Sequence, residues 1–441
     1  MSQFNDFLHN LQFQDLPDEV VYFARRCLLD LIGVGVGGST TELSGIIRKI
    51  AVSQFGAGAG CASLMFDGRP VSPAGAALAN GMTIDSLDAH DGFKPTKGHV
   101  GCSVFPALLA LCEAEHKPDG GGFLAALVAG YEIGGRAGIA LHDTVSDYHT
   151  SGAWGALACA ALGSKVLKLD EEQTRHAIGI AEYHGPRSQM MRVIDHPTML
   201  KDGSGIGAMT GITAAYLARE GFTGAPAITV EEPTVRNIWG DLGSRWTITE
   251  QYFKAYPVCR WAQPALEAAM SLVEQHRIAS ADIERIEVFT FHEGCRLAMR
   301  APQDTEQAQY SLPFPVAAAI VKGRLGPKEI QGEALRDSEI LRLSESMVLN
   351  EVDEYNSVFP EQRYAHAALV LKDGTRHQSE RHAARGDPED HLSDAEIREK
   401  FHQFADPVIG SERASAIEGI VDRLGRAADL GDLLPLLSEP V

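Results

Sequence analysis

The sequence predicts a mainly α-helical protein in which a large all-helical domain is joined to a smaller α+β lid domain. Apolar residues recur with helical spacing through most of the first 270 residues, with almost no clean alternating segment between them. A β-branched and aromatic run at 286–291 and a strand-like segment at 364–371 come only later. Because 441 residues are too many for one ordinary core, we expect a helical domain formed by residues 1–270 and 395–441 and a lid domain formed by 271–394.

The first predicted helix starts near Pro17, where Asp18 and Glu19 supply the acidic first turn that favours a helix N-terminus. From Val20 to Leu31 the apolar residues keep helical spacing. The same spacing predicts six further helices, at 73–81, 104–115, 122–138, 152–167, 171–181 and 204–220. Several of them are rich in glycine and alanine, which predicts helix axes that pack closely together.

The lid domain is predicted to contain an antiparallel sheet. Residues 364–371 are followed by the turn-forming segment 372–375 (Lys-Asp-Gly-Thr), which is typical of a hairpin. Residues 310–322 have helical spacing instead. Ser393 and Glu396 then fit a capping box, so we expect the chain to return to the helical domain at its end.

Two glycine-rich segments resemble nucleotide-binding loops only in part. Residues 33–38 have the glycine spacing of a dinucleotide-binding loop, but that loop follows a strand and here a helix precedes it. We interpret this segment as the turn that ends the first helix. Residues 120–122 lack the lysine and hydroxyl residue of a phosphate loop, and we interpret them as a linker. Neither segment predicts a cofactor.

The formal net charge of −20, from 59 acidic and 39 basic residues, argues against nucleic acid or an anionic membrane as a partner. If the substrate is an anion, specific basic side chains must form a local positive site. The seven cysteines are scattered and form no Cys-x-x-Cys pair, which gives no local support for an iron–sulfur or zinc site. Residues 1–15 lack a secretory pattern, and no apolar run approaches the ~18 residues of a membrane span, so we expect a cytoplasmic protein.

The highest density of charge lies in one loop between two apolar segments. From Asp85 to His99 this loop carries three aspartates, two histidines and two lysines. Such a density is costly between buried helices unless the groups pair or face a cleft. Asp88, His90 and Asp91, with His99, could supply metal ligands. A hydrogen-bonded active-site loop and a solvated surface loop are the alternatives.

Three further segments gather groups that can bind an anion. Residues 148–152 start a small-residue helix, whose backbone N–H groups and hydroxyl could hold an anionic oxygen. Residues 184–203 gather several cations around turn residues, and residues 254–264 combine lysine, tyrosine, arginine and glutamine. Taken one at a time, these segments are equally typical of helix caps and surface groups.

Together, these segments resemble the MmgE/PrpD family. The matching positions are Asn80 and Gly81, Leu87 and Asp88, His99, 148–152, Lys201, 211–215, 221–224, Lys254 with Tyr256, Pro257 and Cys259, Tyr310 with Ser311, 386–388, and Lys400 with Phe401. The resemblance therefore covers nearly the whole chain. This sequence departs from the family pattern at Asp85, at 90–92 (His-Asp-Gly) and at Gln263, where the family usually has His, Asp-Asp-Thr and His.

The resemblance implies a homodimer in which each chain has a helical domain, a lid and a cleft between them, and which uses no metal and no organic cofactor. The family includes 2-methylcitrate dehydratase, cis-aconitate decarboxylase and iminodisuccinate epimerase, which share carbanion-like chemistry beside a carboxylate. We favour a cofactor-independent lyase that dehydrates a small hydroxylated di- or tricarboxylic acid such as 2-methylcitrate, because elimination uses an acid and a base most directly. An epimerase or other isomerase, a decarboxylase and a non-catalytic ligand-binding relative are the alternatives.

Removing a proton beside a carboxylate needs a base and groups that stabilise the developing negative charge. The resemblance implies that Asp88, His99, His149 and Lys201 are catalytic. The residues expected to bind the substrate are His90, Ser151, Arg187, Lys254, Tyr256, Gln263 and Tyr310. His99 and His149 are able to exchange a proton near neutral pH. Gln263 can donate a hydrogen bond to a carboxylate but cannot relay a proton.

Overall fold

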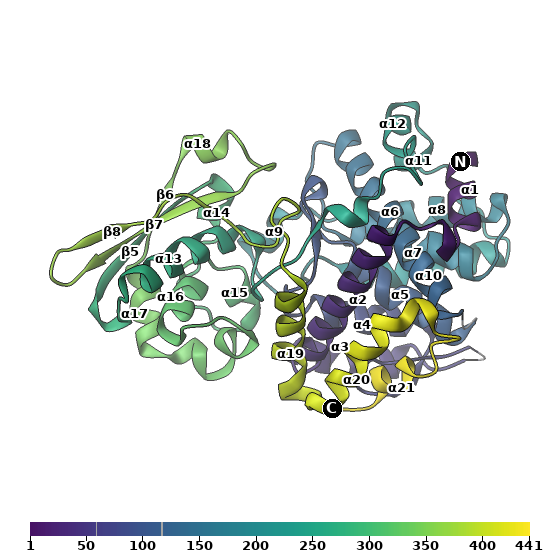
Figure 1. Cartoon of the computed structure of the whole chain (residues 1–441). Coiled ribbons are helices and arrows are strands. Elements are labelled where there is room, and N and C mark those ends of the chain that lie inside the picture. The colour runs from purple at the N-terminus through teal and green to yellow at the C-terminus, as the bar shows by residue number, and fades with distance from the viewer. Residues whose placement is uncertain (59, 116–117) are drawn as a thin grey trace.

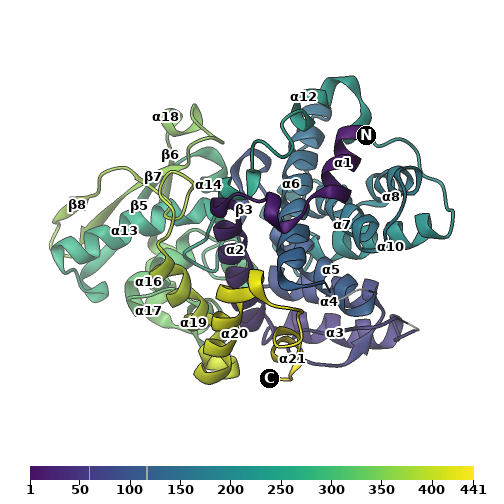
Figure 2. The same ribbon diagram turned by 45° about the vertical axis from the view of Figure 1, so that its right-hand side comes forward.

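The computed structural model describes residues 1–58, 60–115 and 118–441, which form two lobes (Figure 1). The larger lobe contains the helices that precede residue 240 and those that follow residue 393. The smaller lobe contains a sheet and the helices between residues 263 and 356. Figure 2 shows the same separation from a second direction. The predicted fold, mainly α with a smaller α+β domain, is confirmed.

The helices of the larger lobe are α1 (Ser2–Asn10), α2 (Asp18–Gly38), α3 (Glu42–Gln54), α4 (Pro73–Asp85), α5 (Gly101–Ala114), α6 (Gly120–Thr144), α7 (Gly152–Val166), α8 (Glu171–His184), α9 (Met191–Asp195), α10 (Ser204–Arg219), α11 (Ile228–Glu231), α12 (Arg236–Trp239), α19 (Asp394–Ile409), α20 (Ser411–Arg423) and α21 (Leu433–Ser438). Two short antiparallel pairs accompany them, β1 (Ala62–Ser63) with β2 (Pro70–Val71) and β3 (Gly92–Phe93) with β4 (Gln251–Tyr252). The helices predicted before residue 270 are all present, with small differences at their ends.

Helix α6 is long and apolar enough to cross a membrane by length and composition, but 94% of its most apolar window is buried inside the protein. It packs against α5 and α7. Core helices of globular proteins are apolar on all sides in the same way. The apolar spacing predicts only a shorter helix, at 122–138, because glycines interrupt the apolar run.

Glycines bring the backbones of α4, α7 and α10 into contact. A Cβ atom at Gly81 would lie 2.8 Å from Gly205 Cα, and one at Gly207 would lie 2.4 Å from the Gly152 carbonyl oxygen. The Gly152 N–H donates a 2.9 Å hydrogen bond to the Asp202 carbonyl oxygen. The segment that precedes α10 is therefore held against the start of α7, beside the charged loop.

Substitution of Gly207 by alanine is expected to lower the free energy of unfolding by about 1–3 kcal/mol, because the added methyl group overlaps the α7 backbone. Gly45 in α3 is the matched control, since a Cβ atom there meets no atom within 4 Å. Gly45→Ala is expected to leave stability unchanged or raise it, because alanine favours a helix over glycine. Urea unfolding of both variants checks the prediction, and equal stabilities would contradict it.

The two glycine-rich segments have roles that differ from those predicted. Residues 33–38 form the last turns of α2 rather than a turn beyond it. A Cβ atom at Gly33 would lie 2.9 Å from the Phe401 ring, so the glycines let α19 pack closely on α2. Residues 120–122 form the first turn of α6 rather than a linker, and the Asp119 side chain caps this turn.

The smaller lobe has a sheet of strand order β6 (Val348–Glu351), β5 (Ile283–Thr290), β7 (Tyr364–Leu371) and β8 (Arg376–Gln378), with β9 (His382–Ala383) also paired to β7. The pairings of β7 are antiparallel, as predicted, and β6 adds a parallel strand beside β5. The helices are α13 (Gln263–His276), α14 (His292–Arg296), α15 (Thr305–Gln309), α16 (Pro313–Lys322), α17 (Ser338–Ser346) and α18 (Asp353–Asn356). Helix α13 packs on β7 and α16, and the predicted boundary at residue 270 falls inside it.

Helix α19 returns the chain to the larger lobe, where it packs along α2 (Figure 1). The predicted capping box is confirmed, because the Ser393 side chain accepts a hydrogen bond from the Glu396 N–H. Lys400 Nζ lies 2.6 Å from Asp30 Oδ1 and donates a 2.7 Å hydrogen bond to the Ala89 carbonyl oxygen. This buried ion pair ties α19 both to α2 and to the charged loop.

Candidate active site

The charged loop that follows α4 is buried and held by a distant segment. Its strand β3 pairs with β4, which brings the chain to Lys254. Lys254 Nζ lies 2.8 Å from Asp88 Oδ1 and donates a 2.7 Å hydrogen bond to the Asp88 carbonyl oxygen. Asp88 adopts a left-handed conformation with φ 49°, and both side chains are buried. The loop is therefore built into the protein rather than solvated at its surface.

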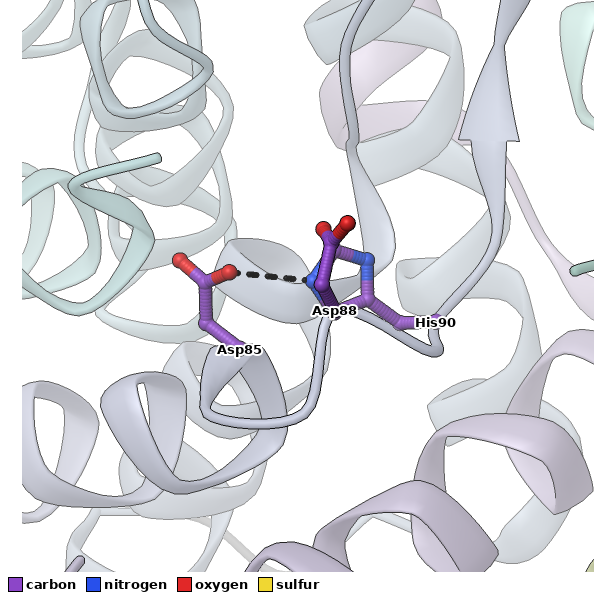
Figure 3. Close-up of side chains that lie close together, drawn as sticks. All are labelled: Asp85, Asp88 and His90. Atoms are coloured by element: carbon purple, nitrogen blue, oxygen red, sulfur yellow. Dashed lines mark hydrogen bonds and ion pairs between the residues drawn. The ribbon is translucent and has the colours of Figure 1, made fainter. Parts of the chain in front are cut away.

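Asp85 and His90 form an ion pair at the base of this loop (Figure 3). His90 Nε2 lies 3.1 Å from Asp85 Oδ1, and neither side chain is exposed. Burial opposes both charges, but the hydrogen bond and the opposite charge outweigh it, so the pKa of Asp85 is lowered and the pKa of His90 is raised. Asp85, which departs from the family pattern, is therefore neutralised by a histidine within the same loop.

His99 is held as a neutral imidazole. Its Nδ1 lies 2.6 Å from the Asp91 carbonyl oxygen, which requires a hydrogen on Nδ1 and leaves a lone pair on Nε2. Burial, followed by the positive charges of Lys254 and His90, lowers the pKa of His99 well below its ordinary value of 6.5. Its backbone N–H donates a 2.9 Å hydrogen bond to Ser151 Oγ. His99 is thus oriented from two sides, with the lone pair of Nε2 left free of both hydrogen bonds.

Asp202 lies opposite the free nitrogen of His99, with its Oδ2 3.3 Å from His99 Nε2. Burial, followed by the negative charges of Asp85 and Asp88, raises the pKa of Asp202 to about 7. Neither carboxyl oxygen has an aligned hydrogen bond within the residues that the structure describes. The two residues, called here the His99–Asp202 pair, therefore combine a neutral base with a carboxyl group that is partly protonated at neutral pH.

A cavity opens over the His99–Asp202 pair. Its lining includes the pair itself and the cationic side chains of Lys97, Lys254, Arg260 and Arg363. Lys97 belongs to the charged loop, whereas Arg363 directly precedes β7 in the smaller lobe. The cavity is therefore lined from both lobes, and its cationic side chains outnumber its carboxyl groups, which are those of Asp88 and Asp202. This excess of cations fits the local positive site that the sequence predicts for an anionic substrate.

Lys201 lies against Tyr310, which lines this cavity, but Lys201 itself is not among the lining residues. Lys201 Nζ donates to Gln309 Oε1 and lies 4.7 Å from the centre of the Tyr310 ring. Tyr310 lines the cavity, and its buried hydroxyl has no hydrogen-bond partner in the described part of the chain. Burial raises the pKa of Tyr310 well above its ordinary value, so this hydroxyl is a hydrogen-bond donor at neutral pH.

The sequence predicts three further site residues, Ser151 and His149 near the start of α7 and Arg187 after α8, and their surroundings differ. Ser151 Oγ accepts the hydrogen bond from the His99 backbone N–H. His149 is buried next to the cavity-lining residue Tyr148, and burial lowers its pKa, with a further contribution from Arg187. Arg187 itself is exposed. Neither His149 nor Arg187 is among the residues that line the cavity.

Tyr256 and Gln263 also lie outside the cavity lining. Gln263 Nε2 donates to the carbonyl oxygens of Tyr256 and Val258 at 3.2 and 3.0 Å. Gln263 Oε1 accepts a 3.0 Å hydrogen bond from Arg260 Nη1. The amide of Gln263 thus holds the 256–263 segment together instead of facing the cavity.

Among the residues that the structure describes, two groups of side chains are close enough to hold a metal ion, Asp85 with Asp88 and His90, and Asp88 with His99 and Asp202. Asp88 belongs to both groups, and its charge is already balanced by the Lys254 ammonium at 2.8 Å. A metal ion there would compete with that ammonium. The expectation that the protein uses no metal stays a prediction.

The sequence does not single out Asp202, Arg363 or Lys97 as site residues. Asp202 directly follows Lys201, a position that already matched the family pattern, and this adjacency was the available signal. Arg363 stands alone in front of a strand, so nothing in its local sequence links it to the charged loop. Only the packing of the two lobes brings it to the cavity.

Comparisons with known proteins agree with this architecture. The family model of the MmgE/PrpD N-terminal domain matches residues 2–236, and that of the MmgE/PrpD C-terminal domain matches residues 256–426. A cis-aconitate decarboxylase-like protein of Aspergillus oryzae is 27% identical over 98% of this chain and 96% of its own length. The cis-aconitate decarboxylase of Mus musculus is 25% identical over 99% of this chain and 93% of its own length. The 2-methylcitrate dehydratase of Escherichia coli is 26% identical over 50% of each chain. The two family models together span most of the sequence, and the chain belongs to the MmgE/PrpD family.

Proposed function

We propose that this protein is a cofactor-independent lyase that dehydrates a small hydroxylated di- or tricarboxylic acid, such as 2-methylcitrate, by removing a proton next to a carboxylate. The observation that carries the proposal is the His99–Asp202 pair. Elimination of water requires a base for the proton and an acid for the leaving hydroxyl, and the two members of this pair have the matching protonation states near neutral pH. The cationic side chains around the pair suit an anionic substrate.

In the proposed reaction, His99 Nε2 takes the proton from the carbon beside a substrate carboxylate, and the C–H electron pair becomes the new C=C bond. The C–O bond breaks, and the departing hydroxyl takes the Asp202 proton and leaves as water. His99 is then protonated and Asp202 ionised, and proton transfer across the 3.3 Å between them restores both groups. The Lys254 ammonium and the Tyr310 hydroxyl stabilise the negative charge that develops on the substrate carboxylate.

Decarboxylation is the second candidate function, and the names of the most extensively matching relatives support it. The relatives that match nearly the full length of this chain are named as cis-aconitate decarboxylases or as similar to them, whereas the 2-methylcitrate dehydratases match over half of it. In that reaction the C–C bond to the departing CO₂ breaks and leaves its electron pair on carbon. Asp202 would then supply the proton that quenches the carbanion.

Incubation with 2-methylcitrate, citrate or cis-aconitate in deuterated water, followed by NMR, tests the proposal. The appearance of an alkene signal when the starting compound is a hydroxy acid supports the dehydratase. Release of labelled CO₂ from carboxyl-labelled cis-aconitate supports the decarboxylase instead. Deuterium incorporation with inversion of configuration would point to an epimerase, and binding without any exchange would point to a non-catalytic relative.

The rate constant kcat/KM is expected to fall on the alkaline side near pH 7, because Asp202 loses its acidic proton there. On the acidic side, activity is expected to persist to well below pH 6.5, because the lowered pKa of His99 keeps this base unprotonated. A pH profile of kcat/KM for the wild type and for Asp202→Asn checks this assignment. The variant is expected to lose the alkaline decline along with most of its rate, and an unchanged decline would assign it to another group.

A further inference from the structure

Arg363 is a buried cation that pairs with no carboxylate in the part of the chain that the structure describes. Its side chain is only 4% exposed, and its Nε and Nη2 atoms are buried without a hydrogen-bond partner in residues 1–58, 60–115 and 118–441. The guanidinium lies 5.8 Å from the centre of the Tyr252 ring and lines the cavity over the His99–Asp202 pair. Arg363 is therefore a buried cation at the cavity whose Nε and Nη2 donors are not used within the described residues.

Other buried arginines in this protein have hydrogen-bond acceptors, and Arg48, for example, donates to the carbonyl oxygens of Ser39 and Met65. Arg136 pairs with Glu132 and with Asp241, and Arg260 pairs with Asp387. Arg260 also lines the cavity, but its terminal nitrogens donate to Asp387, to Gln263 and to backbone carbonyl oxygens. An unpaired buried charge costs free energy, because water is removed from it without compensation. Arg363 therefore differs from Arg260 in having donors that remain available to a ligand.

Lys97 supplies a second cation from the opposite lobe. It lines the same cavity and adopts a left-handed conformation with φ 51°. Its Nζ lies 4.6 Å from the centre of the Tyr148 ring. Burial, followed by the positive charge of Arg363, lowers the pKa of Lys97, while Glu293 and Glu361 partly offset this effect. The two cations thus repel each other across the cavity, and an anion between them would relieve that repulsion.

We propose that Arg363 and Lys97 form a subsite for one carboxylate of a polycarboxylate, separate from the His99–Asp202 pair where the proton is removed. This inference rests on the proposed function and names the feature of the substrate that it recognises. The planar guanidinium of Arg363 suits a carboxylate, because its parallel N–H groups can donate to both oxygens. A carboxylate bound there contacts a residue of each lobe, so it orients the substrate and also holds the lobes together.

Calorimetric titration with tricarballylate, an unreactive tricarboxylate, tests the subsite directly. Arg363→Gln is expected to weaken binding by at least about tenfold, which corresponds to the loss of one charge-assisted hydrogen-bonded pair. Arg376→Gln is the matched control, because Arg376 lies in β8 of the same sheet and pairs with Glu287 at an exposed site. The control variant is expected to bind tricarballylate as tightly as the wild type.

Thermal unfolding without ligand separates this role from a structural one. If Arg363 binds a ligand rather than stabilising the fold, the ligand-free Arg363→Gln variant should be at least as stable as the wild type. The reason is that the substitution removes an uncompensated charge. Tricarballylate should raise the melting temperature of the wild type more than that of the variant. A ligand-free variant that is much less stable than the wild type would overturn the proposal by assigning Arg363 to the fold.

Ligands with fewer carboxylates give a second test of the subsite. The wild type is expected to bind tricarballylate more tightly than glutarate or methylsuccinate, each of which lacks one of its carboxylates, and Arg363→Gln should reduce at least one of these differences. Equal binding of tricarballylate by the wild type and by Arg363→Gln would overturn the subsite while leaving the proposed function in place. Failure of the wild type to bind any polycarboxylate would overturn the proposed function itself.

Discussion

Replacing His99 by asparagine is expected to lower kcat by about 10²- to 10⁴-fold, the range that a positioned general base contributes. The asparagine amide can still donate to the Asp91 carbonyl oxygen, as Nδ1 of His99 does at 2.6 Å. It has no equivalent of Nε2, so the lone pair that faces Asp202 at 3.3 Å is lost while the loop keeps its support. Steady-state kinetics with the acid identified by NMR measure the effect.

The control for this experiment is His292→Asn. His292 is half exposed on the smaller lobe and pairs with Glu351 at the surface. Its replacement is expected to leave kcat unchanged. If His99→Asn retained near-normal turnover with unchanged unfolding behaviour, His99 could not be the base, and the mechanism proposed above would have to be abandoned.

Replacing Lys400 by methionine is expected to lower the free energy of unfolding by about 3–5 kcal/mol, the cost of breaking a buried ion pair on one side. Asp30 lies 2.6 Å from the Lys400 ammonium and is buried in α2, so the substitution leaves its carboxylate without a counter-charge. Burial already raises the pKa of Asp30 with Lys400 present, so the variant is expected to take up a proton there. Urea unfolding measures the loss.

The double variant Asp30→Leu with Lys400→Met separates the missing partner from the altered packing. Removing both charges is expected to recover much of the lost stability, because no unpaired charge then remains in the core. A single variant that unfolds within about 1 kcal/mol of the wild type would show that water reaches Asp30 and that the pair is not sealed. Activity is expected to fall as well, since Lys400 also supports the charged loop through the Ala89 carbonyl oxygen.

Much of the fold follows from local patterns. The apolar spacing from Val20 to Leu31 predicts α2, and Ser393 with Glu396 predicts the start of α19. The glycines at 33–38 wrongly predict the end of the helix, because a local pattern does not contain the partner that makes glycine necessary. That partner is Phe401, far along the chain, and glycine inside a helix is otherwise unfavourable.

The candidate site, like the fold, can be predicted from the sequence only in part. The charge density between Asp85 and His99 is visible in the sequence, because those residues share one loop. The protonation states of His99 and Asp202 are not visible in the sequence, since they depend on charges from other elements. Asp202 has a raised pKa because it is buried beside Asp85 and Asp88, and Arg363 reaches the cavity because the lobes pack together. Composition and spacing cannot specify such contacts.

A crystal structure of the complex with tricarballylate tests the central claim most directly, because it locates the bound acid relative to both charged groups. The predicted result has one carboxylate between Arg363 and Lys97, with the carbon chain directed toward His99 Nε2 and Asp202. A ligand bound on another surface, with this cavity filled only by solvent, would contradict the account.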